Sequence, residues 1–260
     1  MSRGLWTRET VALLLLAAYA PLAGFWLFSG GTDALFRLSL TVLIVLIWHL
    51  VFLLVRAQAP SLSGLVTALA VAMLAPEELG LLQMALGISF GVVMGELVFG
   101  GWGRNVVNPA TIALAFLGFG FPASPWPVFD PPIAWAAIPA ALLGVAFGVM
   151  PAGLIAGAVL LGGFAAISGV LSEVMVYTAG IALVLLVADP VTSASTALGR
   201  WLNGALYAAL VTLFALGWAG AAPLQIAVAA ALLASLAAPV LDDLAIGIWV
   251  ARRRSRHGRT

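Results

Sequence analysis

The stretch GELVFGGWGRNVVNPATIALAFL, residues 95–117, places glycines, an arginine, two asparagines and a proline in a chain that is otherwise mostly hydrocarbon. Asn108 suits an N-cap and Pro109 a first helical residue, so the sequence predicts a helix that starts there. The apolar run 108–120 is shorter than the about 20 residues that cross a bilayer. A short helix that begins in a polar turn has to be shielded by neighbouring helices. This stretch therefore predicts an all-α membrane fold with discontinuous helices.

The composition excludes an ordinary soluble domain. Of the 260 residues, 63 % are hydrophobic and 8 % are charged, whereas soluble domains carry about 25 % charged residues. Because the chain has no cysteine, disulfides, thiolate metal sites and Fe–S clusters on it are excluded. Only one of the two histidines, His49, lies in an apolar run, which excludes a haem held by two helix histidines. No metal site is predicted, and we expect His49 to have a buried or interfacial packing role.

Apolar runs bounded by glycine, proline and charged residues predict ten membrane spans. Two of them, 62–75 and 108–120, are too short to cross about 30 Å upright. Ten spans divide into two sets of five with opposite orientations, which predicts an inverted repeat. Residues 1–245 are predicted to form one membrane domain, and residues 246–260 a basic tail. The predicted spans are 11–28, 37–55, 62–75, 80–98, 108–120, 133–149, 153–170, 174–188, 201–219 and 222–241.

The arginines predict the orientation of the chain in the membrane. All eleven basic residues are arginine, and with ten spans all of them except Arg37 fall on the side of the two termini. The positive-inside rule places that side in the cytoplasm. The basic tail is expected to contact anionic lipid. Nucleic-acid binding is not expected, because no aromatic residues are interleaved with the charges.

The glycine-rich part of the opening stretch predicts a binding site. Gly100, Gly101 and Gly103 permit positive φ angles and the close approach of a flat ligand to the backbone. The N-terminus of the helix after Asn108, with Arg104 beside it, favours an electron-rich or anionic group. The alternative is a plain turn followed by a capped helix.

Two acidic residues lie at the predicted membrane edge. Asp189 ends one helix, and hydroxyl residues follow it before the next helix begins near Arg200. Either Asp189 forms an ion pair with Arg200 or Arg104, or it takes part in a proton or cation relay. Glu96 lies about one turn inside the membrane from the glycine-rich turn. We expect it to reach the surface by snorkelling rather than to form an ion site.

Four segments in order resemble one family. They are SLSGLVTALAVAMLAP (61–76), LVFGGWGRNVVNPATIALAFLGFGFP (97–122), ADPVTSASTALGRWLNGALYAAL (188–210) and APVLDDL (238–244). They resemble segments of the NqrB/RnfD family, the homologous membrane subunits of the Na⁺-translocating NADH:quinone oxidoreductase and of the Rnf electron transport complex. The resemblance implies a ten-helix inverted repeat similar to urea channels, seated in a redox-driven ion pump of the bacterial inner membrane. It also implies flavin or Fe–S proteins as partner subunits.

The resemblance also implies the residues of a flavin or quinone site. The glycine turn would lie beside the flavin or quinone ring, and the segment after Asp189 would line the cofactor cavity. Glu96 departs from the family, in which a basic or neutral residue is expected at its position. The implied cofactor-binding residues are Phe99, Gly100, Gly101, Gly103, Arg104, Asn105, Asn108, Asp189, Thr192 and Thr196.

A second departure concerns covalent flavin. Family members commonly carry an SGAT-type sequence whose threonine takes FMN as a phosphoester. The corresponding loop here, FGFPASPWPVFDPPIAWAAIP (119–139), has Ser124 as its only hydroxyl residue. Covalent FMN is therefore not expected, and non-covalent FMN or riboflavin, or a quinone, is expected instead. The chain is interpreted as a non-autonomous subunit of a membrane oxidoreductase. The alternatives are a cofactor-free channel for a small solute with the same fold, and a scaffold subunit.

Overall fold

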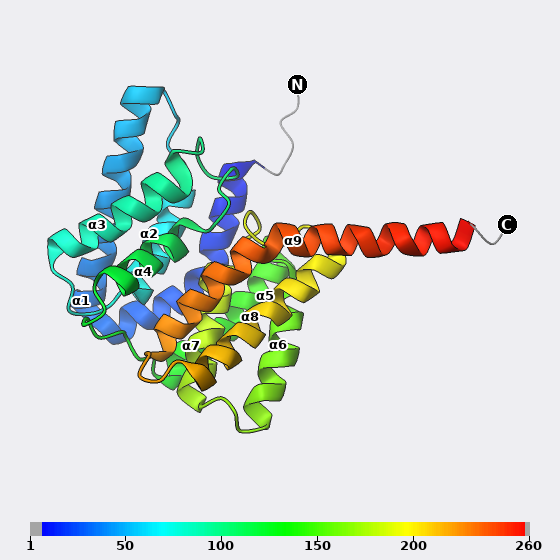
Figure 1. Ribbon diagram of the computed structural model, residues 1–260. Coiled ribbons are helices and arrows are strands. Elements are labelled where there is room, and N and C mark those ends of the chain that lie inside the picture. Colours follow the sequence, from blue (N-terminus) through cyan, green and yellow to red (C-terminus); the bar gives the residue numbers. More distant parts are fainter. Residues whose placement is uncertain (1–6, 258–260) are drawn as a thin grey trace.

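The computed structural model describes residues 7–257 and, among these, the side chains of residues 7–253. The described residues form helices and no strand, which confirms the predicted all-α class (Figure 1). The elements are α1 (Arg8–Arg56), α2 (Ser63–Leu74), α3 (Leu81–Val92), the π-helical segment η1 (Val93–Leu97), α4 (Pro109–Gly120), α5 (Pro131–Ala146), α6 (Ala152–Ile167), α7 (Glu173–Ala182), the π-helical segment η2 (Leu183–Val187), α8 (Ala197–Gly217) and α9 (Pro223–His257).

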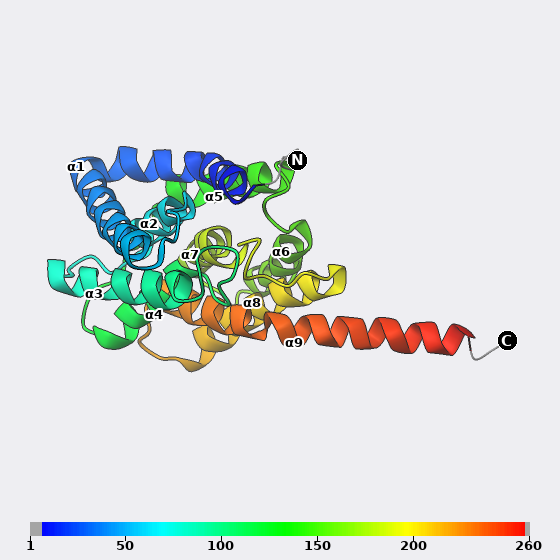
Figure 2. The same ribbon diagram turned by 90° about the horizontal axis from the view of Figure 1, so that it is seen from above.

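Helix α1 contains a sharp kink at Gly31, where φ is 53° and ψ is −130°. Glycine has no Cβ and adopts this backbone conformation, which other residues avoid. The kink divides α1 into two arms that meet at an angle, as Figure 2 shows. The predicted spans 11–28 and 37–55 lie in these two arms, one on each side of the kink.

The two predicted short helices are present as α2 and α4. Each has 12 residues, which corresponds to about 18 Å at 1.5 Å per residue. Helix α2 packs against α1 and α4, and all of its residues except Leu65 are buried. A helix that is apolar on every side belongs in a core. The Asn108 cap and the start at Pro109 are also confirmed for α4.

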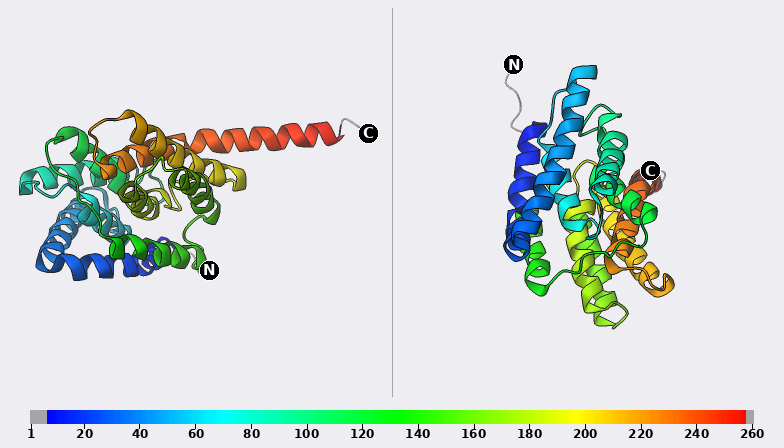
Figure 3. Two further views of the ribbon diagram at one scale, coloured as in Figure 1. Left: turned by 90° about the horizontal axis from the view of Figure 1, so that it is seen from below. Right: turned by 90° about the vertical axis from the view of Figure 1, so that its left-hand side faces the viewer.

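Two of the described helices, α1 and α9, are by length and composition long and apolar enough to cross a membrane. Shorter apolar helices make up most of the remainder. Helix α9 runs unbroken past residue 245, and its C-terminal part extends away from the other helices (Figures 1 and 3). The ten spans, the inverted repeat and the domain boundary at 245 therefore stay predictions.

The glycine-rich turn is held in place by close packing of α3 against α4. Gly87, Gly91 and Gly95 recur every four residues on the face of α3 and η1 that meets α4. A Cβ atom at Gly91 would lie 2.6 Å from the carbonyl oxygen of Pro109. Because glycine leaves this space free, the backbone of η1 passes directly beside the first turn of α4. The turn 98–108 connects these two ends.

Candidate functional site

The glycine-rich turn has the backbone conformation that the sequence predicted. The φ angles of Gly100, Gly101 and Gly103 are 97°, 95° and 94°. The turn closes on η1, because the amide of Gly101 donates to the carbonyl of Glu96 at 3.1 Å. A side chain at any of the three positions would be strained by about 1–3 kcal/mol. The turn therefore depends on glycine for its shape.

A cavity of about 720 Å³ lies beside this turn. We call it the turn cavity. Its walls come from three parts of the chain: the two arms of α1, the loop before α2, and the end of η1 with the glycine turn. The lining residues are Thr7, Arg8, Glu9, His49, Gln58, Ala59, Pro60, Ser61, Glu96, Gly100, Gly101 and Trp102.

Bare backbone forms part of the cavity wall. A Cβ atom on Gly101 would lie 2.9 Å from Nε2 of Gln58, so the Gln58 side chain packs directly against the backbone of Gly101. The guanidinium of Arg8 also holds the turn, donating to the carbonyl of Trp102 at 3.1 Å. Arg104 folds back over the turn, because its Nη1 lies 3.0 Å from where a Cβ of Gly100 would stand. Two cations thus lie at the glycine turn.

The N-terminus of α4 does not present free amides to the cavity, contrary to the sequence-based expectation. The side-chain oxygen of Asn108 accepts from the amides of Ala110 at 2.9 Å and Thr111 at 3.4 Å. The side-chain nitrogen of Asn108 donates to Oδ2 of Asp189 at 2.9 Å. Asn108 and Asp189 are both buried. Asn108 therefore caps α4 and connects it to the turn after η2.

The predicted ion pair of Asp189 with Arg104 or Arg200 is wrong. Uncharged donors satisfy Asp189 instead: the amide of Val191 donates to its Oδ1 at 2.9 Å, and Asn108 donates to its Oδ2. Arg200 is exposed and donates to the carbonyl of Ala194. A buried acid next to capped backbone finds amide donors more readily than a charged side chain that would lose its water.

The other predicted site residues fall in three places. Asn105 is buried inside the glycine turn and accepts from the amide of Gly103 at 3.0 Å. Thr192 is buried in the turn after Asp189. Phe99 is 47 % exposed on the outside of the turn. Of the ten predicted residues, Gly100 and Gly101 line the turn cavity.

Thr196 serves the start of α8 rather than the turn cavity. It caps the helix by accepting from the amide of Gly199 at 3.0 Å, and its hydroxyl donates to Oδ1 of Asp242 at 2.6 Å. Both oxygens of Asp242 accept from the amides and hydroxyls of Ser195 and Thr196. The carboxylate of Asp242 thereby joins α9 to α8, a link that the sequence did not predict.

Glu96 does not snorkel to the surface. Its exposed fraction is 0 %, and its Oε1 accepts from the hydroxyl of Ser63 at 3.0 Å. Nε2 of His49 lies 4.0 Å from the same oxygen. His49 is buried as expected, but it faces an acid as well as apolar neighbours. Glu9, which no sequence pattern singled out, accepts from the amide of Leu62 at 2.9 Å and lines the same cavity.

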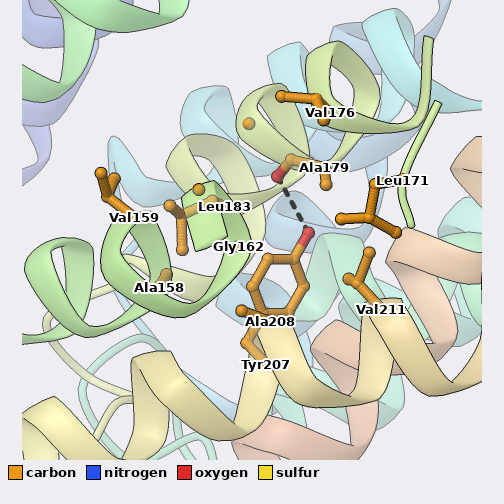
Figure 4. Close-up of a pocket in the computed structure, with 12 residues that line it drawn as sticks. Ala158, Val159, Gly162, Leu171, Val176, Ala179, Leu183, Tyr207, Ala208 and Val211 are labelled. Carbon is orange, nitrogen blue, oxygen red and sulfur yellow. Dashed lines mark hydrogen bonds between the residues drawn. The ribbon is translucent and has the colours of Figure 1, made fainter. Parts of the chain in front are cut away.

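A second cavity, of about 190 Å³, lies between α6, α7 and α8. Figure 4 shows that its lining is almost entirely apolar, with the hydroxyl of Tyr207 directed toward the carbonyl of Ala179. That hydroxyl donates to this carbonyl at 2.9 Å. Its hydrogen is therefore already used, and this cavity offers no free donor to orient a polar ligand.

Known proteins share the region that contains the glycine turn. Residues 5–132 match the model of the NQR2, RnfD, RnfE family. The NqrB subunit of the Na(+)-translocating NADH-quinone reductase of Yersinia pestis is 40 % identical over 116 residues, which are 44 % of this chain and 28 % of the relative. The corresponding protein of Pseudomonas paraeruginosa is 28 % identical over 269 residues, which cover 81 % of this chain and 66 % of the relative. The chain thus aligns with between about a quarter and two thirds of the length of these relatives. It belongs to the family of NQR2, RnfD and RnfE.

Proposed function

We propose that this chain is a membrane subunit of an electron-transfer complex of the Nqr or Rnf type and that it holds a non-covalent flavin or a quinone in the turn cavity. The observation that carries the proposal is the backbone of Gly100 and Gly101, which lines a cavity of about 720 Å³ without side chains. Small-molecule sites usually measure about 300–1,000 Å³. The related proteins named above are subunits of NADH-quinone reductases.

The residues around the turn cavity fit such a ring. Gly100 and Gly101 line the cavity without side chains, so a flat ring can approach their backbone once the Gln58 side chain, which packs on Gly101, turns aside. Arg8 and Arg104 place positive charge at the turn, where it would favour electron-rich oxygens on the ring. A bound flavin or quinone would supply the electron-accepting group, and the protein would supply position and electrostatics.

The remaining predicted residues do not line the turn cavity, and several of them hold its walls in place. Asn105 fixes the glycine turn through its bond to the Gly103 amide. Asn108 and Asp189 tie the start of α4 to the turn after η2. Thr192 and Thr196 do not line the turn cavity, so for them the proposal is the coupling cation and not the ring. Partner subunits carrying flavin or Fe–S clusters, coupled ion translocation, and cytoplasmic termini in the bacterial inner membrane belong to the same proposal.

An absorption spectrum of the purified full-length chain tests the proposal. We expect flavin bands or extractable quinone in the wild type and a loss of at least about tenfold in occupancy in Gly101→Leu. Gly220→Leu is the matched control, because Gly220 also has a positive φ, 81°, and a Cβ there meets nothing within 4 Å. Both variants carry similar backbone strain, about 1–3 kcal/mol, and only the first places a side chain at the turn cavity.

Three results would contradict the proposal. Equal cofactor content in Gly101→Leu and the wild type would show that the cofactor does not contact Gly101. An equal loss in Gly220→Leu would assign the effect to strain. A colourless, quinone-free protein that conducts a small solute in liposomes without a redox partner would favour the solute channel instead.

A further inference from the structure

Glu96 and His49 form a buried acid–base pair that the proposed function does not use. Glu96 lies in η1 and His49 in the second arm of α1, and their exposed fractions are 0 % and 4 %. Nε2 of His49 stands 4.0 Å from Oε1 of Glu96, which is longer than a hydrogen bond. Both residues line the turn cavity. The pair is therefore buried and also open to a water-sized space.

Each member of the pair has a polar atom without a hydrogen-bond partner. These atoms are Oε2 of Glu96 and Nε2 of His49. The backbone amide of Trp102 favours the charged carboxylate, but Oε2 itself has no hydrogen-bond partner. A buried carboxylate oxygen with no donor is strongly unfavourable when it is charged. The arrangement becomes favourable once a proton, or a water that carries one, occupies the space between the two side chains.

The hydrogen bonds of His49 favour a proton over a metal ion in this position. The amide of Ser61 donates to Nδ1 of His49 at 3.4 Å, so the neutral ring carries its hydrogen on Nε2. An Nε2–H group directed at the carboxylate presents a hydrogen to the space between them. A metal ion there would need the lone pair that this hydrogen occupies.

The surrounding charges act in the same direction. Glu9, from the first arm of α1, and Asp189, from the turn after η2, both lie close enough for their charges to act on Glu96. Negative neighbours favour the neutral acid. Arg8 of α1 and Arg104 of the glycine turn are exposed to solvent, which weakens their attraction for the buried carboxylate of Glu96. Helix α2 contributes hydroxyls and amides and no charged side chain.

We propose that Glu96 and His49 together form a proton-binding site that is loaded from the water of the turn cavity. A hydronium ion in the cavity gives up one proton and becomes water. The O–H bond forms on Oε2 of Glu96, and His49 stabilises the loaded state through its Nε2–H. No electron is transferred, and the charge of the site rises by one. The site does not depend on a bound flavin or quinone, so it stands or falls separately from the proposed function.

Imidazole NMR of the full-length chain in nanodiscs tests the histidine. The chain contains only two histidines, so ¹⁵N-histidine labelling combined with His257→Gln leaves the signal of His49 alone. We expect Nδ1 without hydrogen and Nε2 with hydrogen at alkaline pH. Infrared difference spectra over the same pH range should show the carboxylic-acid C=O band of Glu96 growing as the His49 signals move, with one shared midpoint.

Three variants should change the acid band and the titration midpoint in different ways. Glu96→Gln should remove the acid band and abolish the pH-dependent movement of the His49 signals that accompanies it. Ser63→Ala removes the donor to Oε1, so it should raise the proton affinity of Glu96 and move the midpoint to higher pH. Glu78→Gln, an exposed acid in the loop before α3, should change neither. If Glu96→Gln does not assemble, the wild-type titration and the sign of Ser63→Ala decide the question.

Two outcomes would overturn the proposal. One is an acid band that persists in Glu96→Gln, or a His49 signal that does not change along with it. The other is a shift of the His49 signals when sodium replaces choline at constant ionic strength, since this would identify a metal-ion site. A protein without bound cofactor that gives the expected titration would support the proton site and count only against the proposed function.

Discussion

The bond between Asn108 and Asp189 should be one of the main polar links between the two halves of the chain. Asn108 caps α4, and its side-chain nitrogen donates to Oδ2 of Asp189 at 2.9 Å across a sequence separation of 81 residues. Replacing Asn108 by alanine removes the cap and the bond to Asp189 together. Asn108→Ser keeps a capping hydroxyl and removes only the bond. The two variants therefore separate the local effect from the long-range one.

The size of both effects follows from the geometry. Loss of an asparagine cap destabilises a helix by about 1 kcal/mol. Leaving the buried Oδ2 of Asp189 without its donor adds about 1–3 kcal/mol, and more if the group is charged. We therefore expect Asn108→Ala to lose about 2–4 kcal/mol in unfolding free energy, and Asn108→Ser to lose about 1–3 kcal/mol. For a chain of this size, 1 kcal/mol corresponds to about 2–4 °C in Tm.

Thermal unfolding of the purified protein in one detergent checks the prediction. The Tm of Asn108→Ala should fall by about 4–16 °C, and the Tm of Asn108→Ser should lie between it and the wild type. The double variant Asn108→Ala with Asp189→Asn should lose less than the sum of the single changes, because the two residues share one bond. An Asn108→Ala protein as stable as the wild type, or additive effects in the double variant, would refute the reasoning.

Two further changes test how the helices are joined. Asp242→Asn should destabilise the junction of α8 and α9 by about 1.5–3 kcal/mol, because the Asp242 oxygens accept charge-assisted hydrogen bonds from the start of α8. The control is Asp243→Asn, at an exposed neighbouring residue, which should leave the Tm unchanged. Gly204→Ala should push α8 away from α6 and lower the Tm, because the added Cβ would overlap the carbonyl of Leu154. The control is Gly162→Ala, whose Cβ would meet its nearest atom at 3.6 Å, and it should change the Tm by less than half as much as Gly204→Ala. Similar Tm values within either pair would contradict these contacts.

The parts of the site that depend on neighbouring residues were predictable from the sequence. The start of α4 was predicted from Asn108 and Pro109, which act within their own turn. The positive φ angles of the glycine turn were predicted because glycine alone tolerates them without strain. The short length of α2 and α4 followed from the distance between breaking residues. Each of these features is fixed within one short stretch of consecutive residues.

The pairing of the acids was not predictable in the same way. Charge suggested an arginine for Asp189, but the structure gives it an asparagine and a backbone amide. Glu96 finds Ser63 across a separation of 33 residues, and His49 from a different helix. Sequence patterns rank partners by charge and proximity along the chain. Burial instead selects whichever donor the packing of several helices brings within reach.

The burial of Glu96 follows from η1. In α3 the buried positions recur at intervals of three and four, and continuing this period past Gly95 would bury positions 98 and 99 and leave Glu96 beside the buried stripe. The structure buries Glu96 and Leu97 instead and leaves Val98 and Phe99 about half exposed.

A π-helical turn inserts one extra residue and rotates everything after it by about 100° around the axis. The amide of Val98 accordingly donates to the carbonyl of Val93, five residues back. One extra residue in the helix therefore turns the carboxylate inward, toward Ser63 and the turn cavity. The buried positions of α3 and η1 are Met84, Gly87, Ile88, Gly91, Val92, Gly95, Glu96 and Leu97.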